Sequence, residues 1–421
     1  MEIKIGFGET DITPVEPALL SGYYYDRRST GVHDRLFSRT MAVSDGKETV
    51  LLCIVDLISV SVKLVAEVRS IVEKRSGIRP ENVMIAAIHT HTAPYLEKEE
   101  KYAQGLPEKL FLSIEEALAT LAPSQMQAGR IDWPGVQFIR RYRMKDGSVR
   151  TNPGIGNPDV LEPIGTVDPE ILLLTVEQNN IPRGAVAHFA LHSDTVGGTE
   201  ISADWSYFLR ETVRRAKGKD LAVLTPIGPS GDVNHWNVFK DVALRGFEET
   251  ARIGNRIGEG VIKAWETRVP VKFGPLRAAK QAFKAPLRFP SEKELEEARL
   301  LMEQPAPQGV DFTMDRVEAR RRIKVAGIGK DLDIEVGALA FGNVAFVSSP
   351  CEYFSELGRR IKRASPFEYT FVCTHAGGQC GYIGEKRNYD EGGYETTSSI
   401  FLPGAGEMIA DTAIDLLCSL A

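Results

Sequence analysis

Short apolar runs alternate along this chain with longer stretches in which apolar residues recur every three or four positions. The runs have the length of buried strands and the periodic stretches have the length of helices. Such alternation is typical of the α/β class, so we predict mixed β-sheets flanked by helices. The predicted strands are Thr49–Val55, Val83–Ile88, Ile171–Val176, Ala185–Leu191, Leu221–Pro226, Val336–Phe341 and Val344–Ser348. The predicted helices are Val62–Lys74, Glu108–Leu121, Trp205–Ala216, Phe247–Thr267, Glu292–Glu303 and Tyr353–Lys362.

We expect one large domain over residues 1–421, because strand-like runs resume after every irregular stretch. The Pro- and Gly-rich passage from Thr151 to Pro169 is predicted to be a long ordered loop. Residues from about 286 to 330 become highly charged, with two helical patterns at Glu292–Glu303 and Asp315–Lys324. They predict a solvated helical hairpin inserted into the domain.

The composition of the chain bears on membrane insertion, nucleic-acid binding and disulfide content. No segment approaches 18 consecutive apolar residues, and the amino terminus has no apolar leader, so we expect a cytoplasmic protein without membrane insertion. The net charge of −6, with both signs interspersed, argues against a nucleic-acid partner. Five scattered cysteines indicate reduced thiols rather than a disulfide framework.

Two histidines follow one of the most apolar runs. Val83–Ile88 is succeeded by His89-Thr90-His91-Thr92-Ala93-Pro94. Alternate residues of an extended chain share a face, so His89 and His91 are expected to project together from the strand end. Ligand sites of α/β proteins collect at such ends, which makes the pair a candidate site.

Other polar residues follow later runs. His192 comes directly after Ala185–Leu191, whereas His188 lies inside that run and is expected to be a hydrogen-bonded core residue, with a helical His188–His192 metal pair as the alternative. Glu352 follows the run Val344–Ser348 and, taken alone, reads as a favourable charge at a helix amino terminus.

Several ordered motifs together resemble the amino-terminal catalytic domain of the neutral/alkaline non-lysosomal ceramidase family. The resemblance is collinear from about Gly6 to the carboxyl terminus, with nothing left over for the immunoglobulin-like domain of true ceramidases. Its motifs are Asp11-Ile12-Thr13-Pro14, Ser21-Gly22-Tyr23, Gly31-Val32-His33-Asp34-Arg35-Leu36-Phe37-Ser38-Arg39, the His-Thr-His segment, Gly231-Asp232-Val233 and Gly393-Tyr394-Glu395.

The resemblance implies a Zn²⁺ site. Its ligands are expected to be His89, His192, Glu352 and Tyr394, a donor set that suits zinc and leaves a position for water. His91 is similar to the family residue that contacts the substrate carbonyl, with the opposite assignment of His89 and His91 as the rival.

An arginine shares the task of His91 in the family. Arg140 is the best match and Arg141 the near rival, while a surface charge is the ordinary reading of either. The arginines of this stretch could also receive an anionic or hydroxyl-rich molecule; they are Arg140, Arg141, Arg143 and Arg150.

One position departs from the family. Where ceramidases carry the serine taken to be the nucleophile, this chain has Asn234, which cannot form an acyl-enzyme. Asp232 and His235 are candidate proton carriers or substrate contacts. Asp56 and Asp194 are candidates for orienting ligand imidazoles, and structural hydrogen bonding is an equal alternative for each.

These observations predict a zinc-dependent hydrolase that acts through metal-activated water on a small polar amide, ester, lactone or sugar-derived substrate. Ceramide itself is not the expected substrate. The alternatives are a metal-dependent glycoside-cleaving enzyme and a non-catalytic descendant that keeps the pocket for ligand binding.

Overall fold

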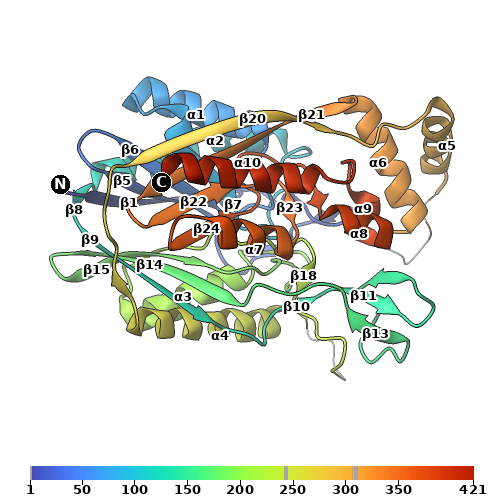
Figure 1. Ribbon diagram of the computed structural model, residues 1–421, viewed down its shortest axis with the longest axis horizontal. Coiled ribbons are helices and arrows are strands. Elements are labelled where there is room, and N and C mark those ends of the chain that lie inside the picture. The colour runs from blue at the N-terminus through green and yellow to red at the C-terminus, as the bar shows by residue number, and fades with distance from the viewer. Residues whose placement is uncertain (1, 241–244, 306, 308–311) are drawn as a thin grey trace.

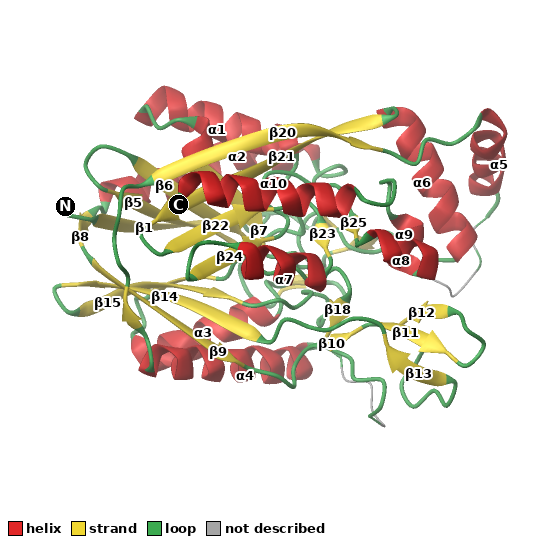
Figure 2. Ribbon diagram, viewed as in Figure 1, coloured by secondary structure: helices red, strands yellow, loops and turns green. Residues whose placement is uncertain are grey.

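The computed structural model describes residues 2–240, 245–305, 307 and 312–421. It confirms the predicted mixed α/β class: three larger sheets are stacked with helices against their outer faces (Figures 1 and 2). The carboxyl-terminal helix lies along the third sheet, and the hairpin helices project at one end of the molecule (Figure 1).

The first sheet carries the run that precedes the His-Thr-His motif. Its strand order is β7-β6-β5-β1-β8, with β6 and β7 parallel and the other pairs antiparallel. Helices α1 and α2 pack on each other, and α2 covers β1 and β5. The elements are β1 (Lys4–Asp11), β5 (Phe37–Ser44), β6 (Thr49–Val55), β7 (Val83–Ala87), β8 (Ala122–Pro123), α1 (Val62–Ser76) and α2 (Glu100–Ala119).

The second sheet carries the run that precedes His192. Its order is β17-β15-β14-β9-β19, with only β15 and β17 parallel. Helices α3 and α4 form a pair below it in Figure 1, and α4 packs on β9 and β14. The elements are β9 (Gln125–Asp132), β14 (Glu170–Gln178), β15 (Ile181–His188), β17 (Ala222–Leu224), β19 (Val269–Pro270), α3 (Trp205–Lys217) and α4 (Phe247–Glu266).

The third sheet, ordered β20-β21-β22-β24, lies between two apolar cores. In β21, Leu339 and Phe341 join the core shared with the first two sheets, whereas Ala338 and Ala340 face a second core under α7 and α10. The alternation follows from the two-residue period of a strand. The elements are β20 (Arg277–Pro286), β21 (Asp331–Phe341), β22 (Val344–Ser348), β24 (Tyr369–Cys373), α7 (Ser355–Ala364) and α10 (Ala405–Leu420).

Two helices interrupt the third sheet between β20 and β21. They are α5 (Glu292–Glu303) and α6 (Met314–Ile328), and they pack against each other where the helical hairpin was predicted. A capping box at Ser291 and Glu294 begins α5. That the whole chain is a single domain stays a prediction.

Short elements complete the fold. The passage predicted as a loop contains β13, which joins β11 and β12 in a small sheet. The other short pairs are β2 with β3, β4 with β16, β10 with β18, and β23 with β25. The bounds are β2 (Leu19–Leu20), β3 (Arg27–Arg28), β4 (Gly31–Val32), β10 (Phe138–Ile139), β11 (Arg141–Met144), β12 (Val149–Thr151), β13 (Val160–Pro163), β16 (Glu200–Ile201), β18 (Val233–Asn234), β23 (Glu352–Tyr353), β25 (Tyr382–Ile383), the 3₁₀ turn Pro80–Asn82, α8 (Lys386–Glu391) and α9 (Tyr394–Ser398).

Two further expectations can be compared with the fold. Among the described residues, no helix has both the length and the apolar character needed to cross a bilayer. The five cysteines are all free thiols, as predicted.

Candidate metal centre

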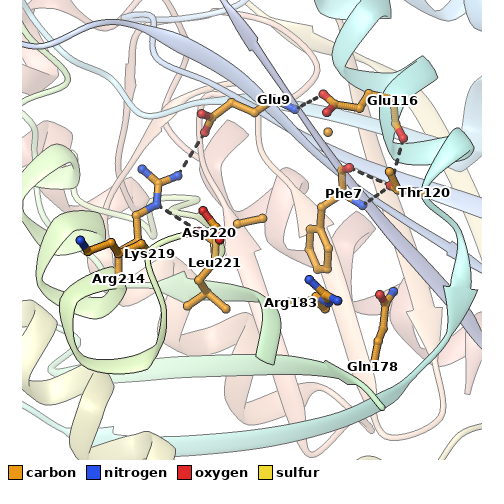
Figure 3. A pocket seen from close by; sticks show the side chains of 12 residues that line it. Phe7, Glu9, Glu116, Thr120, Gln178, Arg183, Arg214, Lys219, Asp220 and Leu221 are labelled. Carbon is orange, nitrogen blue, oxygen red and sulfur yellow. Dashed lines mark hydrogen bonds and ion pairs between the residues drawn. The ribbon is translucent and has the colours of Figure 1, made fainter. Parts of the chain in front are cut away.

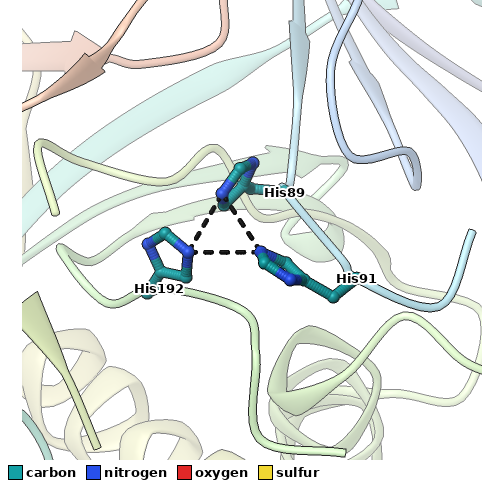
Figure 4. Close-up of side chains that lie close together, drawn as sticks. All are labelled: His89, His91 and His192. Carbon is teal, nitrogen blue, oxygen red and sulfur yellow. Dashed lines mark hydrogen bonds between the residues drawn. The ribbon is translucent and has the colours of Figure 1, made fainter. Parts of the chain in front are cut away.

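Three buried histidines from two different sheets converge on one point (Figure 4). His89 and His91 follow β7, and His192 follows β15. The Nε2 atoms of His89 and His192 are 3.1 Å apart, those of His91 and His192 are 3.2 Å apart, and those of His89 and His91 are 3.4 Å apart. The structure therefore brings His91 into the same cluster as the two histidines predicted to be ligands.

The convergence depends on a turn rather than on a continuing strand. β7 ends at Ala87, and His89 has a φ of 62°, in the left-handed region that non-glycine residues seldom occupy. The expectation that an extended chain places both side chains on one face is thus wrong in its geometry, although the two rings do meet. Their planes are perpendicular, with centroids 4.9 Å apart.

The hydrogen bonds of His89 set its tautomer. Its Nδ1 lies 2.8 Å from the carbonyl oxygen of Ile58, which can only accept, so Nδ1 donates, and in the neutral form of the ring Nε2 presents a lone pair to the other histidines. Burial lowers the pKa of His91 to about 4 and holds the pKa of His192 well below its ordinary value. Neutral imidazoles are the form that binds metals.

A carboxylate lies beside the three histidines. Glu352 Oε2 is 3.4 Å from His89 Nε2. Burial alone would raise the pKa of Glu352, but His89, followed by His375 and Tyr382, outweighs it and lowers that pKa to about 2. The residue is therefore an anion at neutral pH, and Oε2 has no hydrogen-bond partner among the described residues.

The donor set fits a zinc ion. Zinc–nitrogen distances of about 2.0–2.1 Å in a tetrahedral arrangement separate ligand nitrogens by about 3.3 Å, and the three Nε2 separations run from 3.1 to 3.4 Å. At most one nitrogen of each facing pair can donate to the other, so three Nε2 atoms this close do not satisfy one another. A cation satisfies all three lone pairs and the unpartnered carboxylate oxygen.

Tyr394 and Tyr382 have different surroundings. The Tyr394 hydroxyl lies 3.0 Å from the Tyr24 hydroxyl, and its ring packs on Phe312 with centroids 4.9 Å apart. Tyr382 instead lies opposite Glu352 in the β23–β25 pair, and Glu352 and Arg140 both act on the pKa of its hydroxyl, which burial raises. The geometry thus favours Tyr382 over the predicted Tyr394 as the tyrosine nearest to the carboxylate, because only Tyr382 contacts Glu352.

A pocket of about 540 Å³ opens beside the cluster. Its walls combine aromatic rings, arginines and polar groups with His91 and His192, and Val149, Thr151, Met314 and glycines complete them. The aromatic members are Tyr23, Tyr24, Trp236, Phe312, Tyr382 and Tyr394, and the charged and amide members are Arg140, Arg150, Arg245, Asp194 and Asn152.

The two candidate arginines have separate places. Arg140 lines the pocket, and its Nε lies 2.7 Å from Glu395 Oε1, while an Nη donates to the Gly231 carbonyl oxygen. Arg141 is buried and donates to the carbonyl oxygen of Gly392 at 2.8 Å. Arg140 therefore faces the pocket, and Arg141 holds the segment that leads into α9.

The acidic candidates differ in the same way. Asp194 lies 3.6 Å from His91 Nδ1 and accepts a hydrogen bond from the Tyr23 hydroxyl at 2.5 Å. Asp56 forms ion pairs with Arg39 and Arg210, each at 2.8 Å, so its contacts are structural. Of these two aspartates, Asp194 is the one that contacts a histidine of the cluster.

The side chains of the turn after Gly231 are hydrogen-bonded to, or packed on, neighbouring residues around the site. Both carboxylate oxygens of Asp232 accept hydrogen bonds from Ser355, at 2.8 and 2.9 Å, where α7 begins. Asn234 donates to Asn152 Oδ1 at 2.6 Å, and His235 is buried against Trp236. Among the described residues, none of these three side chains belongs to the pocket wall.

Sequence reasoning missed Tyr382 and His375. His375 stacks on His89 with ring centroids 3.9 Å apart and has a φ of 52°. It follows β24 as His89 follows β7, so the strand-end signal was available. Tyr382 lies in a short strand without an apolar run, and no sequence signal distinguishes it from Tyr394. His188 is the core residue predicted, with Nε2 2.9 Å from the Val372 carbonyl oxygen, and its place in β15 excludes the helical pair with His192.

A larger hollow of about 730 Å³ lies elsewhere, between β1 and the start of β17 (Figure 3). Arg214 pairs there with Glu9 at 3.3 Å, and the Glu9 amide donates to Glu116 at 2.8 Å. Its lining includes no histidine or cysteine among the described residues. The chemistry of the histidine cluster makes the smaller pocket the candidate site.

Comparisons with known proteins identify relatives of this chain. Residues 3–205 match the sequence model of the amino-terminal domain of the neutral/alkaline non-lysosomal ceramidases. The neutral ceramidase of Pseudomonas aeruginosa is 24% identical over 307 residues, which are 63% of this chain and 44% of that protein. The chain thus spans less than half the length of this curated relative.

Solved structures share the fold. The crystal structure of the Pseudomonas aeruginosa neutral ceramidase superposes with a TM-score of 0.79 at 18% identity, covering 100% of this chain and 74% of that one. A ceramidase complexed with C2 gives a TM-score of 0.77 at 17% identity, covering 100% of this chain and 75% of that one. At these identities the likeness establishes the fold alone.

Proposed function

Since the chain carries a domain of the neutral/alkaline non-lysosomal ceramidase family, we propose that it is a zinc-dependent hydrolase of a small polar amide or ester. The observation that carries the proposal is the buried triangle of Nε2 atoms from His89, His91 and His192, 3.1–3.4 Å on a side, at the wall of a pocket of about 540 Å³. Lactones and sugar-derived amides or esters belong to the same class.

His89, His192 and Glu352 would hold the metal, with His91 and Tyr382 as the further donors nearest to them. A zinc ion bound there supplies a Lewis acid that lowers the pKa of water and polarises a carbonyl group. The proposal moves the tyrosine ligand from Tyr394 to Tyr382, since Tyr382 contacts Glu352.

Arg140 would stabilise the negative charge that develops on the substrate carbonyl oxygen. Its guanidinium is fixed by Glu395 and by the Gly231 carbonyl oxygen, so little reorganisation is needed during the reaction. Asp194, on His91 Nδ1, would orient that imidazole.

Asn234 supports a mechanism without a protein nucleophile. Its amide nitrogen donates to Asn152, and its oxygen accepts from the Trp236 amide at 3.0 Å. Both ends of the side chain are therefore engaged in the turn, and an amide cannot form an acyl-enzyme. In this scheme Asp232 has a structural role and transfers no proton, because both of its carboxylate oxygens accept hydrogen bonds from Ser355.

The test combines metal analysis with a substrate panel. Purified protein is expected to contain about one zinc per chain and to hydrolyse at least one class of chromogenic amide, ester or lactone, with loss of activity on chelation and recovery on adding zinc. His192→Ala is expected to lose both properties. His33→Gln is the control, because His33 stacks on Phe247 outside the pocket, with centroids 3.7 Å apart.

Two results would overturn the proposal. Protein that takes up no zinc, even when zinc is supplied, would contradict the metal site. Zinc-loaded protein that cleaves chromogenic glycosides but no amide, ester or lactone would favour the glycoside-cleaving alternative.

A further inference from the structure

The lining of the pocket carries more positive than negative charge. Its charged lining residues are three arginines and one aspartate: Arg140, Arg150, Arg245 and Asp194. The charge of Arg140 is balanced by the fully buried Glu395 at 2.7 Å. The charges of Arg150 and Arg245 remain to be explained.

Arg245 is held by an aromatic ring instead of a carboxylate. Its guanidinium carbon lies 4.2 Å from the centre of the Trp236 ring. Across the described part of the chain it forms no ion pair. Stacking occupies the face of a guanidinium and leaves its N–H groups, which lie in the plane, available for two parallel hydrogen bonds to an anion.

Arg245 also lies on the side of the pocket that adjoins the histidines. Arg245 lines the same pocket as Tyr23, His91 and His192. Burial and Asp194 raise the pKa of Tyr23, and Arg245 opposes that shift. The Tyr23 hydroxyl is bonded to Asp194, which contacts His91. A single ligand in this pocket could therefore place an anionic group on Arg245 and another group at the histidine cluster.

Arg150, on β12, offers a second cation with a weak partner. Arg150 forms an ion pair with Asp146, with 3.3 Å between an Nη atom and a carboxylate oxygen, and both side chains are 57% exposed. Exposed pairs of this kind contribute little because solvent screens them. An anionic ligand can therefore replace Asp146 at small cost.

We infer that the substrate carries an anionic group, a carboxylate or a phosphate monoester, which Arg245 binds at the mouth with help from Arg150 while the bond to be cleaved lies at the histidine cluster. The inference rests on the proposed hydrolase function and narrows its substrate class. It gives Trp236 a role as well, because the ring orients the Arg245 guanidinium.

The kinetic test compares two esters of similar length, p-nitrophenyl hemiglutarate and p-nitrophenyl pentanoate. Arg245→Gln is expected to raise KM for the anionic ester about tenfold and to leave the neutral ester within twofold, since a hydrogen bond to a charged group of this exposure is worth about one decade. The difference should shrink at 0.5 M NaCl because surface charges are screened. Arg245→Lys should restore part of it.

Arg256→Gln is the matched control. Arg256 also stacks on a tryptophan, with its guanidinium carbon 3.9 Å from the Trp133 ring centre, but it lies on α4 outside the pocket. It should leave both esters unchanged. Equal effects of Arg245→Gln on the two esters, or a wild-type preference for the neutral ester, would overturn the inference while the hydrolase function stands.

Binding measurements separate the inference from the function. Calorimetric titration of wild-type protein with glutarate, glycerol phosphate and neutral glutaramide should detect at least one anion and no glutaramide, and Arg245→Gln should weaken the anion about tenfold. Whichever of glutarate and glycerol phosphate binds more tightly identifies the group. Binding of this kind in a protein that cleaves no amide, ester or lactone of the substrate panel would support the anion site and contradict the hydrolase. Absence of Arg245-dependent binding would contradict the anion site.

Discussion

Replacing His91 with alanine should remove zinc from the site, not merely slow catalysis. The Nε2 atom of His91 lies 3.2 and 3.4 Å from those of His192 and His89, close to the separation of about 3.3 Å that tetrahedral zinc ligation gives. Four-ligand zinc sites have apparent binding free energies of about 10–16 kcal/mol, so one ligand accounts for about 2.5–4 kcal/mol. We therefore expect the zinc Kd to rise about a hundred- to a thousandfold.

The assay is competition for zinc against a fluorescent chelator of known affinity, on wild type, His89→Ala, His91→Ala and the control His33→Gln. Circular dichroism of each variant shows whether the fold persists. If His91→Ala binds zinc within about threefold of wild type and yet loses a hundred- to a thousandfold in turnover, the reasoning from the triangle is refuted. His91 would then contact the substrate, as the family resemblance implies.

Three other predictions concern the surroundings of the site. Burial raises the pKa of Asp232 to about 6, so the stability that this carboxyl contributes is present below about pH 4 and is lost as the pH rises through 6. Between pH 4 and 7 we therefore expect the free energy of unfolding of Asp232→Asn, measured in urea, to rise relative to wild type by up to about 3 kcal/mol, and a constant difference would contradict this. A Cβ on Gly231 would lie 2.3 Å from the Glu352 carbonyl oxygen, so Gly231→Ala should weaken zinc binding in the same competition assay, unlike Gly327→Ala, whose added methyl group meets nothing within 4 Å. Phe312 packs on Tyr394 at the pocket wall, and Phe312→Ala should shift the kcat/KM ratio of benzoyl to acetyl esters about tenfold toward the larger group, whereas an unchanged ratio would show that Phe312 does not limit size.

The sequence predicted several strands whose residues are buried on both faces, but it missed β5 and β24, which are buried in the same way. β6, β7 and β22 consist almost entirely of apolar residues, and their predicted bounds agree with the structure to within one residue. β20 was missed because most of its residues face solvent, and its sequence RAAKQAFKAP has neither an apolar run nor alternation. α10 was missed as well, although it covers the third sheet.

The sequence predicted which strand ends contribute residues to the candidate site, but it did not predict the contacts between their side chains. His89, His192 and Glu352 follow apolar runs, and the structure brings these three together. The turn at His89, which brings His91 into the cluster, depends on a left-handed backbone conformation that no pattern in the sequence specifies. The choice between Tyr382 and Tyr394 depends on the pairing of β23 with β25, which places Tyr382 opposite Glu352 and which no pattern in the sequence specifies.

The third sheet separates two apolar cores, and the candidate ligands come from both sides of that division. The histidines follow strands of the first core, whereas Glu352 and Tyr382 lie on strands whose neighbours Tyr353 and Ile383 belong to the second. An ion held by both groups would act as a crosslink between two cooperative units of folding. Metal-loaded protein would then unfold in one transition, and chelation would let the half under α7 and α10 open at a lower denaturant concentration than the rest.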